Sequence, residues 1–198
     1  MRFESTLSVI FLPSVLIAAC GSEDAHDVAH EGESEGEGCE PRYAIDDKDG
    51  DPLVSDEAWR AIATAIEKDR VTVDDAESPR FLVPAEGETF LASDEPPTLT
   101  WEIQKIGSQG ARRHHGGVTT DDVFLAEIDV SIEKCPLAFI TTGDTTGNEW
   151  PLSGDEWDAV VAAGGARTAR VTWAYLSNNV VTEGPVRATT DRAFSIAK

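Results

Sequence analysis

The chain has 198 residues, of which 37 are Asp or Glu and 16 are Lys or Arg, so its formal net charge is −21. This length fits one domain with attached segments, or two small domains at most. The excess of negative charge argues against nucleic acid or an anionic membrane surface as the main partner, because both repel an acidic protein. Three cysteines are too few for a small fold held together by many disulfides.

The first twenty residues have the features of a targeting segment. Arg2 supplies a positive charge near the N-terminus, and the apolar run over residues 7–16 is followed by small residues and Cys20. The run is too short to cross a bilayer as a permanent helix, which is typical of a secretory signal peptide. We therefore expect a signal peptide over residues 1–19. An ordinary cleaved signal peptide, with Cys20 as a bystander, is the alternative.

Leu16-Ile17-Ala18-Ala19-Cys20 resembles the lipobox of bacterial lipoprotein signal peptides. The resemblance implies that Cys20 becomes the first residue of the mature chain and carries a thioether-linked diacylglycerol and an N-acyl group. Each buried methylene contributes about 0.8 kcal/mol, so several acyl chains hold a protein more firmly than one. Gly21 stands where an Asp would favour inner-membrane retention. The resemblance therefore implies a lipid anchor in the outer membrane, on its periplasmic face or at the cell surface.

An acidic segment follows the cysteine. Residues 21–57 contain fourteen Asp and Glu against only Arg42 and Lys48. Gly, Ser and Glu dominate its first half, which is the composition of a solvated linker that repels itself. We expect residues 20–54 to form an acidic tether, disordered over 21–38, that keeps the body away from the membrane.

A short amphipathic helix is predicted next. Trp59 and Ile62 lie at helical spacing, and Ser55 is a suitable N-cap. The predicted helix covers about residues 56–68, within a helix-and-linker segment over 55–79. We expect Trp59 to pack on the body rather than to bind a ligand.

Strand patterns dominate residues 80–198. The clearest is the alternation over residues 123–132, which places the apolar residues from Phe124 to Ile132 on one face and Glu127, Asp129 and Ser131 on the other. Further strands are predicted over residues 81–83, 89–90, 98–103, 137–142, 169–177, 180–181 and 193–196.

Caps and turns separate these strands. Ser153 and Glu156 form a capping box that opens a short helix, and Asn178-Asn179 suits a tight hairpin turn. Short strands with turn residues between them favour a sandwich over a parallel sheet.

The segment Phe81–Phe90, followed by Pro97–Trp101, resembles the first strands of fibronectin type III and immunoglobulin-like modules, and Gly184–Ile196 suits their last strand. The resemblance implies a mainly β fold over residues 80–198, an antiparallel Ig-like sandwich with one or two short helices. It implies no function, because sandwiches carry many unrelated functions.

Two cysteines remain once Cys20 is assigned to the lipid. We expect Cys39 and Cys135 to form a disulfide, which closes a loop worth about 4–5 kcal/mol in the chain-entropy model. A thiol metal site or a reactive thiol is the alternative.

The four histidines form two pairs. His26 and His30 are four residues apart in the acidic segment, while His114 and His115 lie in a Gly-flanked loop. Imidazoles with acidic neighbours could bind Zn²⁺, Cu²⁺ or Ni²⁺ weakly. Solvated histidines in a spacer and in an exposed hairpin loop are the simpler interpretation.

An Asp-rich stretch partly matches a calcium-binding loop. Asp47, Asp49 and Asp51 precede or follow Gly50 as in the acidic half of an EF-hand, but Ile45 stands at the first ligand position. An acidic turn before the helix explains the same residues.

Enzyme signatures are absent from the sequence. It has no Gly-x-Ser-x-Gly elbow, no Gly-rich phosphate loop and no His-Glu-x-x-His helix. We therefore expect no catalytic residues and no cofactor besides the covalent lipid. The expected function is binding or assembly in the cell envelope, with a protein partner and without nucleic acid. Periplasmic metal handling by the histidines and acidic residues of the tether is the alternative, and an enzyme is the third interpretation.

Overall fold

Two long strands, β7 (Val118–Ile132) and β10 (Gly165–Ser177), pair antiparallel at the centre of the fold. Their register runs from Asp121 opposite Leu176 to Ile128 opposite Ala169. The computed structural model describes residues 39–45, 50–103, 113–115, 118–132, 135–143 and 148–198, with the backbone alone for 113–115 and 131–132. The statements below concern these residues.

Seven further strands join the central pair in the larger sheet. Its main path has the order β1-β8-β7-β10-β11-β2, β12 and β4 extend it beside β10, and β6 pairs with β7. These strands are β1 (Arg42–Tyr43), β2 (Thr72–Val73), β4 (Glu88–Leu91), β6 (Arg113–His115), β8 (Cys135–Thr142), β11 (Val180–Arg187) and β12 (Arg192–Ala197). The pairs β1–β8, β2–β11 and β4–β12 are parallel, so the sheet is mixed.

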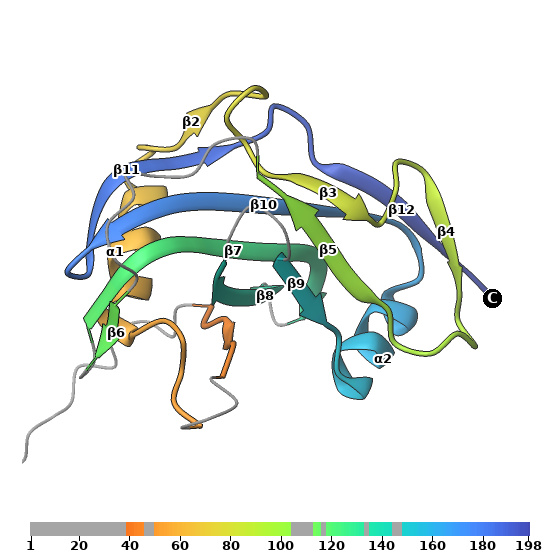
Figure 1. Cartoon of the computed structure of the whole chain (residues 1–198). Coiled ribbons are helices and arrows are strands. Elements are labelled where there is room, and N and C mark those ends of the chain that lie inside the picture. The colour runs from red at the N-terminus through yellow and green to blue at the C-terminus, as the bar shows by residue number, and fades with distance from the viewer. Residues whose placement is uncertain (1–38, 46–49, 104–112, 116–117, 133–134, 144–147) are drawn as a thin grey trace, which may run out of the picture. The chain divides into compact units, whose positions relative to one another are not determined.

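A smaller antiparallel sheet packs on one face of the larger one. It has the order β3-β5-β9, formed by β3 (Arg80–Val83), β5 (Thr98–Glu102) and β9 (Asn148–Pro151). In Figure 1 these three strands lie in front of β7 and β10. The main core fills the space between the sheets, and its largest fully buried side chains are Trp101, Trp150, Trp173 and Phe124. The fold is mainly β and consistent with a β-sandwich.

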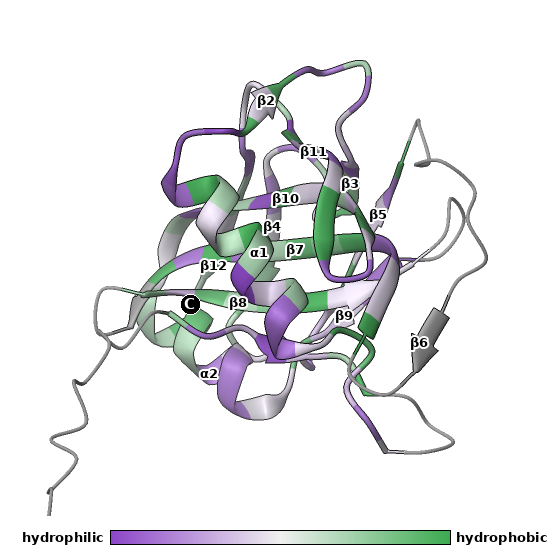
Figure 2. Ribbon diagram, turned by 90° about the vertical axis from the view of Figure 1, so that its left-hand side faces the viewer, coloured by the Kyte–Doolittle hydropathy of each residue, from purple (hydrophilic) through white to green (hydrophobic). Residues whose placement is uncertain are grey.

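Helix α1 (Asp56–Glu67) covers the opposite face of the larger sheet. Its buried residues Ala58, Ile62 and Ala65 recur at helical spacing. Ala58 and Ile62 pack against apolar residues of the sheet, namely Val123, Leu125, Ile140, Ala174 and Leu176. Figure 2 shows the predominantly hydrophobic strands β7 and β8 behind this helix. The helix and its Ser55 N-cap are as predicted, because the Ser55 hydroxyl accepts a hydrogen bond from the Ala58 N–H at 3.2 Å.

Helix α2 (Gly154–Ala163) begins with the predicted capping box. The Ser153 N–H donates to the Glu156 carboxylate at 2.7 Å, and the Glu156 N–H donates to the Ser153 hydroxyl at 3.2 Å. Trp157 and Val160 point into the main core. Gly164 ends the helix with a φ of 55°, a conformation that glycine adopts without strain.

The Asn178-Asn179 hairpin turn is also as predicted, with φ of 52° and 63°. Asn179 additionally fixes the start of α1, since its side-chain oxygen accepts a hydrogen bond from the Ser55 hydroxyl at 3.0 Å and another from the Thr119 N–H. The hairpin, β7 and α1 therefore meet at one hydrogen-bonded junction.

The predicted boundary of the tether at residue 54 is wrong. Cys39 is bonded to Cys135, β1 pairs with β8, and Val54 is fully buried against α1 and the sheet. Residues 39–45 and 50–54 thus belong to the folded body, because the disulfide and the strand pairing outweigh the acidic composition. The segment 55–79 is likewise part of this body and not a linker to it, since α1 and β2 pack on the larger sheet.

His114 and His115, predicted to lie in an exposed hairpin loop, belong to a strand. Arg113–His115 form β6, which pairs with the first residues of β7 as a hairpin.

Gly184 lies at an irregularity in the β10–β11 pairing, with a φ of +79°. A Cβ there would lie 2.9 Å from the Trp173 carbonyl oxygen and 3.2 Å from the Val186 nitrogen. Gly87 has a similar φ of +72°, and a Cβ there would have no atom within 4 Å. A substitution at Gly87 therefore measures the free-energy cost of the backbone conformation without the cost of a clash.

We predict that Gly87→Ala lowers the free energy of unfolding by about 1 kcal/mol. Gly184→Ala should lower it by about 2 kcal/mol more, because backbone atoms must move. Urea unfolding monitored by tryptophan fluorescence measures both values. Equal losses in the two variants would show that the contact at Gly184 is not tight.

Candidate functional site

A cavity of about 210 Å³ lies where one edge of β10 changes its partner strand. β10 pairs with β12 over residues 165–169 and with β11 over residues 172–177, on the same edge. The loop 188–191 connects these two partners and leaves positions 170 and 171 without a paired strand there. The lining comes from this loop, β10, β3 and the segment before β3.

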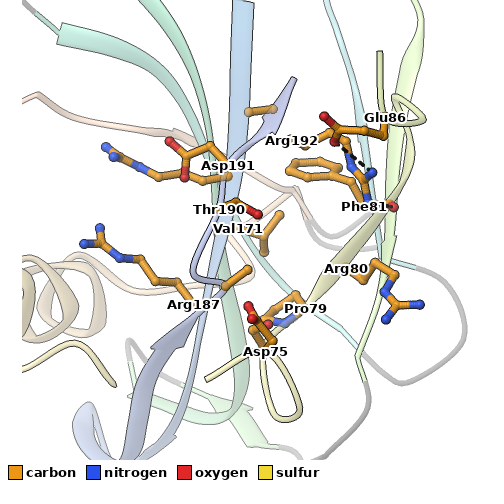
Figure 3. Close-up of a pocket in the computed structure, with 14 residues that line it drawn as sticks. Asp75, Pro79, Arg80, Phe81, Glu86, Val171, Arg187, Thr190, Asp191 and Arg192 are labelled. Atoms are coloured by element: carbon orange, nitrogen blue, oxygen red, sulfur yellow. Dashed lines mark hydrogen bonds and ion pairs between the residues drawn. The ribbon is translucent and has the colours of Figure 1, made fainter. Parts of the chain in front are cut away.

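Four arginines line this cavity, in a chain with only 16 basic residues: Arg80, Arg170, Arg187 and Arg192. Three carboxylates accompany them: Asp75, Glu86 and Asp191. Figure 3 shows that the side chains do not converge on one point. Arg187 and Asp191 extend to one side of the strand layer, whereas Arg192, Glu86 and Arg80 lie on the side of β3. The lining therefore falls into two halves on opposite sides of the strand layer.

Arg170 is fixed by a bidentate ion pair. Its Nε and Nη2 donate to the two carboxylate oxygens of Glu127 at 2.8 and 3.0 Å, and the two residues are directly opposite in the β7–β10 register. The hydrogen bond with Glu127 raises the pKa of Arg170; burial acts against this, and the charges of Glu127 and Asp191 add to it. The guanidinium thus stays charged and holds one orientation.

A second cavity of about 270 Å³ adjoins the first, since Arg170 and Asp191 line both. Its other lining residues are Glu127, Asp129, Cys135, Pro136 and Thr168. The second cavity and the Arg187–Asp191 half of the first form a groove with charged walls. It runs along the part of the larger sheet's α1 face that lies beyond the residues under α1.

In the β3 half of the first cavity, Arg192 is held by two interactions. Its Nη1 lies 3.1 Å from a Glu86 carboxylate oxygen, and its Nη2 donates to the Phe81 carbonyl at 3.0 Å. Within the described residues, Arg80 and Arg187 form neither a hydrogen bond nor an ion pair through their side chains. Arg170 and Arg192 thus interact with other residues of the fold, whereas the guanidiniums of Arg80 and Arg187 can bind a ligand.

The disulfide predicted from the cysteine count is present between Cys39 and Cys135, with Cα atoms 5.3 Å apart. It ties the start of the described body to β8, next to the second cavity. The Cys135 sulfur is therefore not available as a nucleophile or metal ligand while the bond is intact.

Most other predicted site residues lie outside the described part of the chain. This applies to Cys20, to His26 and His30, and to Asp47 and Asp49. For His114 and His115 the structure describes only the backbone of β6, and Asp51 is exposed. No group of three metal-ligating side chains occurs among the residues that the structure describes. No helix within them is long and apolar enough to span a membrane.

The sequence analysis did not identify the four arginines that line the first cavity. They are scattered from residue 80 to residue 192, and only strand register brings Arg170 opposite Glu127 and close to the end of β11. Glu127 directly follows the apolar run Val123–Ala126, and Arg170 directly precedes the mostly apolar run Val171–Leu176. These positions single out the two residues but not the groove.

No protein-family model, curated protein or solved structure matches this chain.

The Glu127–Arg170 pair should stabilise the groove. We predict that Glu127→Gln lowers the free energy of unfolding by about 1 kcal/mol, a modest value because the Arg170 side chain is 38% exposed and water screens the pair. Asp129→Asn is the matched control, since it removes the same charge from an exposed position of the same strand and should change stability by less than about 0.5 kcal/mol.

The raised pKa of Arg170 predicts how its contribution to stability depends on pH. A group whose pKa is higher in the folded state stabilises the protein fully at any pH below its unfolded-state pKa. The stabilisation is lost only as the pH rises through the folded-state pKa. Both values are strongly alkaline, so the Arg170 contribution should be constant from about pH 6 to pH 9. Urea unfolding of the unchanged chain, Glu127→Gln and Asp129→Asn at about pH 6 and pH 9 tests this. An equal effect of Glu127→Gln and Asp129→Asn would contradict the structural role of the ion pair.

Proposed function

We propose that the chain is a lipid-anchored protein of the bacterial cell envelope whose β-rich body is a binding module without catalytic activity. The observation that carries this proposal is the assignment of the cysteines. Cys39 and Cys135 bond to each other, so Cys20 is the one cysteine of three left for another purpose. It stands directly after Leu16-Ile17-Ala18-Ala19, where a lipoprotein signal peptide is cut.

The disulfide also supports the proposed compartment. Disulfides persist in oxidising places such as the periplasm and the cell surface and are rare in the cytosol. A secreted chain anchored by Cys20 would fold there. Gly21, in the place of a retention Asp, supports the outer membrane as the destination.

The acidic segment is proposed to act as the spacer. Residues 21–38 contain seven Asp and Glu and no Lys or Arg. Mutual repulsion extends such a segment, and anionic lipid head groups repel it. The body would then reach partners at a distance from the bilayer.

The finer fold assignment is an Ig-like or fibronectin-like variant. Support comes from the antiparallel pairing of β3 with β5 and from Trp101, whose side chain is buried between the sheets as expected for the Leu-x-Trp strand of such modules. Helices α1 and α2 and the three parallel strand pairs would be additions to that plan.

A binding role, rather than catalysis, is favoured by the chemistry of the groove. Its described lining offers guanidiniums, carboxylates and hydroxyls, and its Cys135 is in the disulfide. These groups can recognise a charged ligand through hydrogen bonds. The groove is therefore the proposed ligand-binding surface.

The anchor is tested by Cys20→Ser, with Cys39→Ser as the matched control. We predict that the unchanged chain and the control sediment with membranes and incorporate an alkyne-labelled fatty acid. Cys20→Ser should incorporate none and lose its membrane attachment, since no acyl chain is left to bury. Equal labelling and sedimentation of Cys20→Ser and the unchanged chain would contradict the proposal.

A further inference from the structure

Arg187 is the one guanidinium on the α1 side of the groove that no described residue holds. The β10–β11 register places it opposite Thr172, two residues along β10 from Arg170. Residues two apart on a strand share a face, so Arg170 and Arg187 are diagonal neighbours on one face of the larger sheet. Two adjacent positive charges on one face favour an anion beside them.

Arg170 is already paired with a carboxylate of the protein, whereas Arg187 is not. Glu127 occupies Nε and Nη2 of Arg170. Arg187 is half-buried at the end of β11 and lines the same cavity. Figure 3 shows its side chain extending away from Pro79 and Phe81, on the side where Asp191 also lies. A partly desolvated guanidinium with free donors gains more from a charged partner than a fully solvated one does.

The surroundings of Arg187 select the kind of anion. Asp75 and Asp191 line the same cavity, and Asp75 already accepts a hydrogen bond from the Thr189 N–H at 2.8 Å. Two nearby carboxylates disfavour a dianion such as phosphate more than a monoanion. The planar fork of a guanidinium matches a carboxylate with two parallel hydrogen bonds.

We propose that Arg187, beside the fixed Arg170, binds the side-chain carboxylate of an acidic peptide segment in a protein partner. This inference rests on the proposed binding function and names the chemistry of its ligand. The acidic body does not prevent it, because charges more than a Debye length of about 8 Å away are screened at physiological salt.

The test is a titration of the full chain, purified in non-ionic detergent with ¹⁵N-labelled arginine, followed through the Nε–Hε resonances. The probes are the peptide Ac-Gly-Glu-Glu-Gly-NH₂, its Gln-Gln counterpart, and inorganic phosphate. Arg187→Gln is compared with Arg80→Gln, which removes the same charge from the same cavity lining on the β3 side. Arg187→Lys keeps the charge but not the fork.

We expect saturable binding of the Glu peptide, at least about tenfold weaker in Arg187→Gln and within about twofold of the unchanged chain in Arg80→Gln. Arg187→Lys should bind with intermediate strength, which also shows that the site survives substitution. Equal weakening in Arg80→Gln, equal binding of the Gln peptide, tighter binding of phosphate, or no saturation below about 10 mM would each overturn the inference. Loss of membrane attachment in Cys20→Ser is a separate result, so failure of this site and failure of the anchor are distinguishable.

Discussion

The constraint on which the structure depends is that the central pair of strands is buried on both faces. Along β7, Phe124, Ala126 and Ile128 face the small sheet, while Val123 and Leu125 face α1. Strand β10 shows the same division. A sheet buried on two sides needs a layer on each side, so α1 and the sheet β3-β5-β9 are required parts of one fold.

The groove lies where this two-sided burial ends. Helix α1 has only 12 residues and covers the apolar half of its face of the sheet. Beyond it the same face carries Glu127, Arg170 and Asp129, and the change of partner from β11 to β12 leaves an opening beside Arg170. Polar residues can stand there because water reaches them, and their charges are what a binding partner would meet. The proposed ligand chemistry thus follows from the limited reach of one helix.

Local signals in the sequence predicted local structure well. Ser55, the Ser153–Glu156 capping box and Asn178-Asn179 act through bonds to near neighbours, and all three are present as expected. What depends on register was not predictable: the parallel pairs β1–β8, β2–β11 and β4–β12 join segments far apart in the chain. The arginine groove could not be predicted either, because its residues meet only through the register of β10 with β7, β11 and β12.

Native-state hydrogen exchange measured by mass spectrometry tests the central claim most directly. If two-sided burial of β7 and β10 supports the fold, their amides over residues 121–128 and 172–176 should exchange only through global unfolding. The short outer strands β2 and β4 should exchange faster, by local opening. Exchange of β7 and β10 as fast as that of β4 would contradict the account.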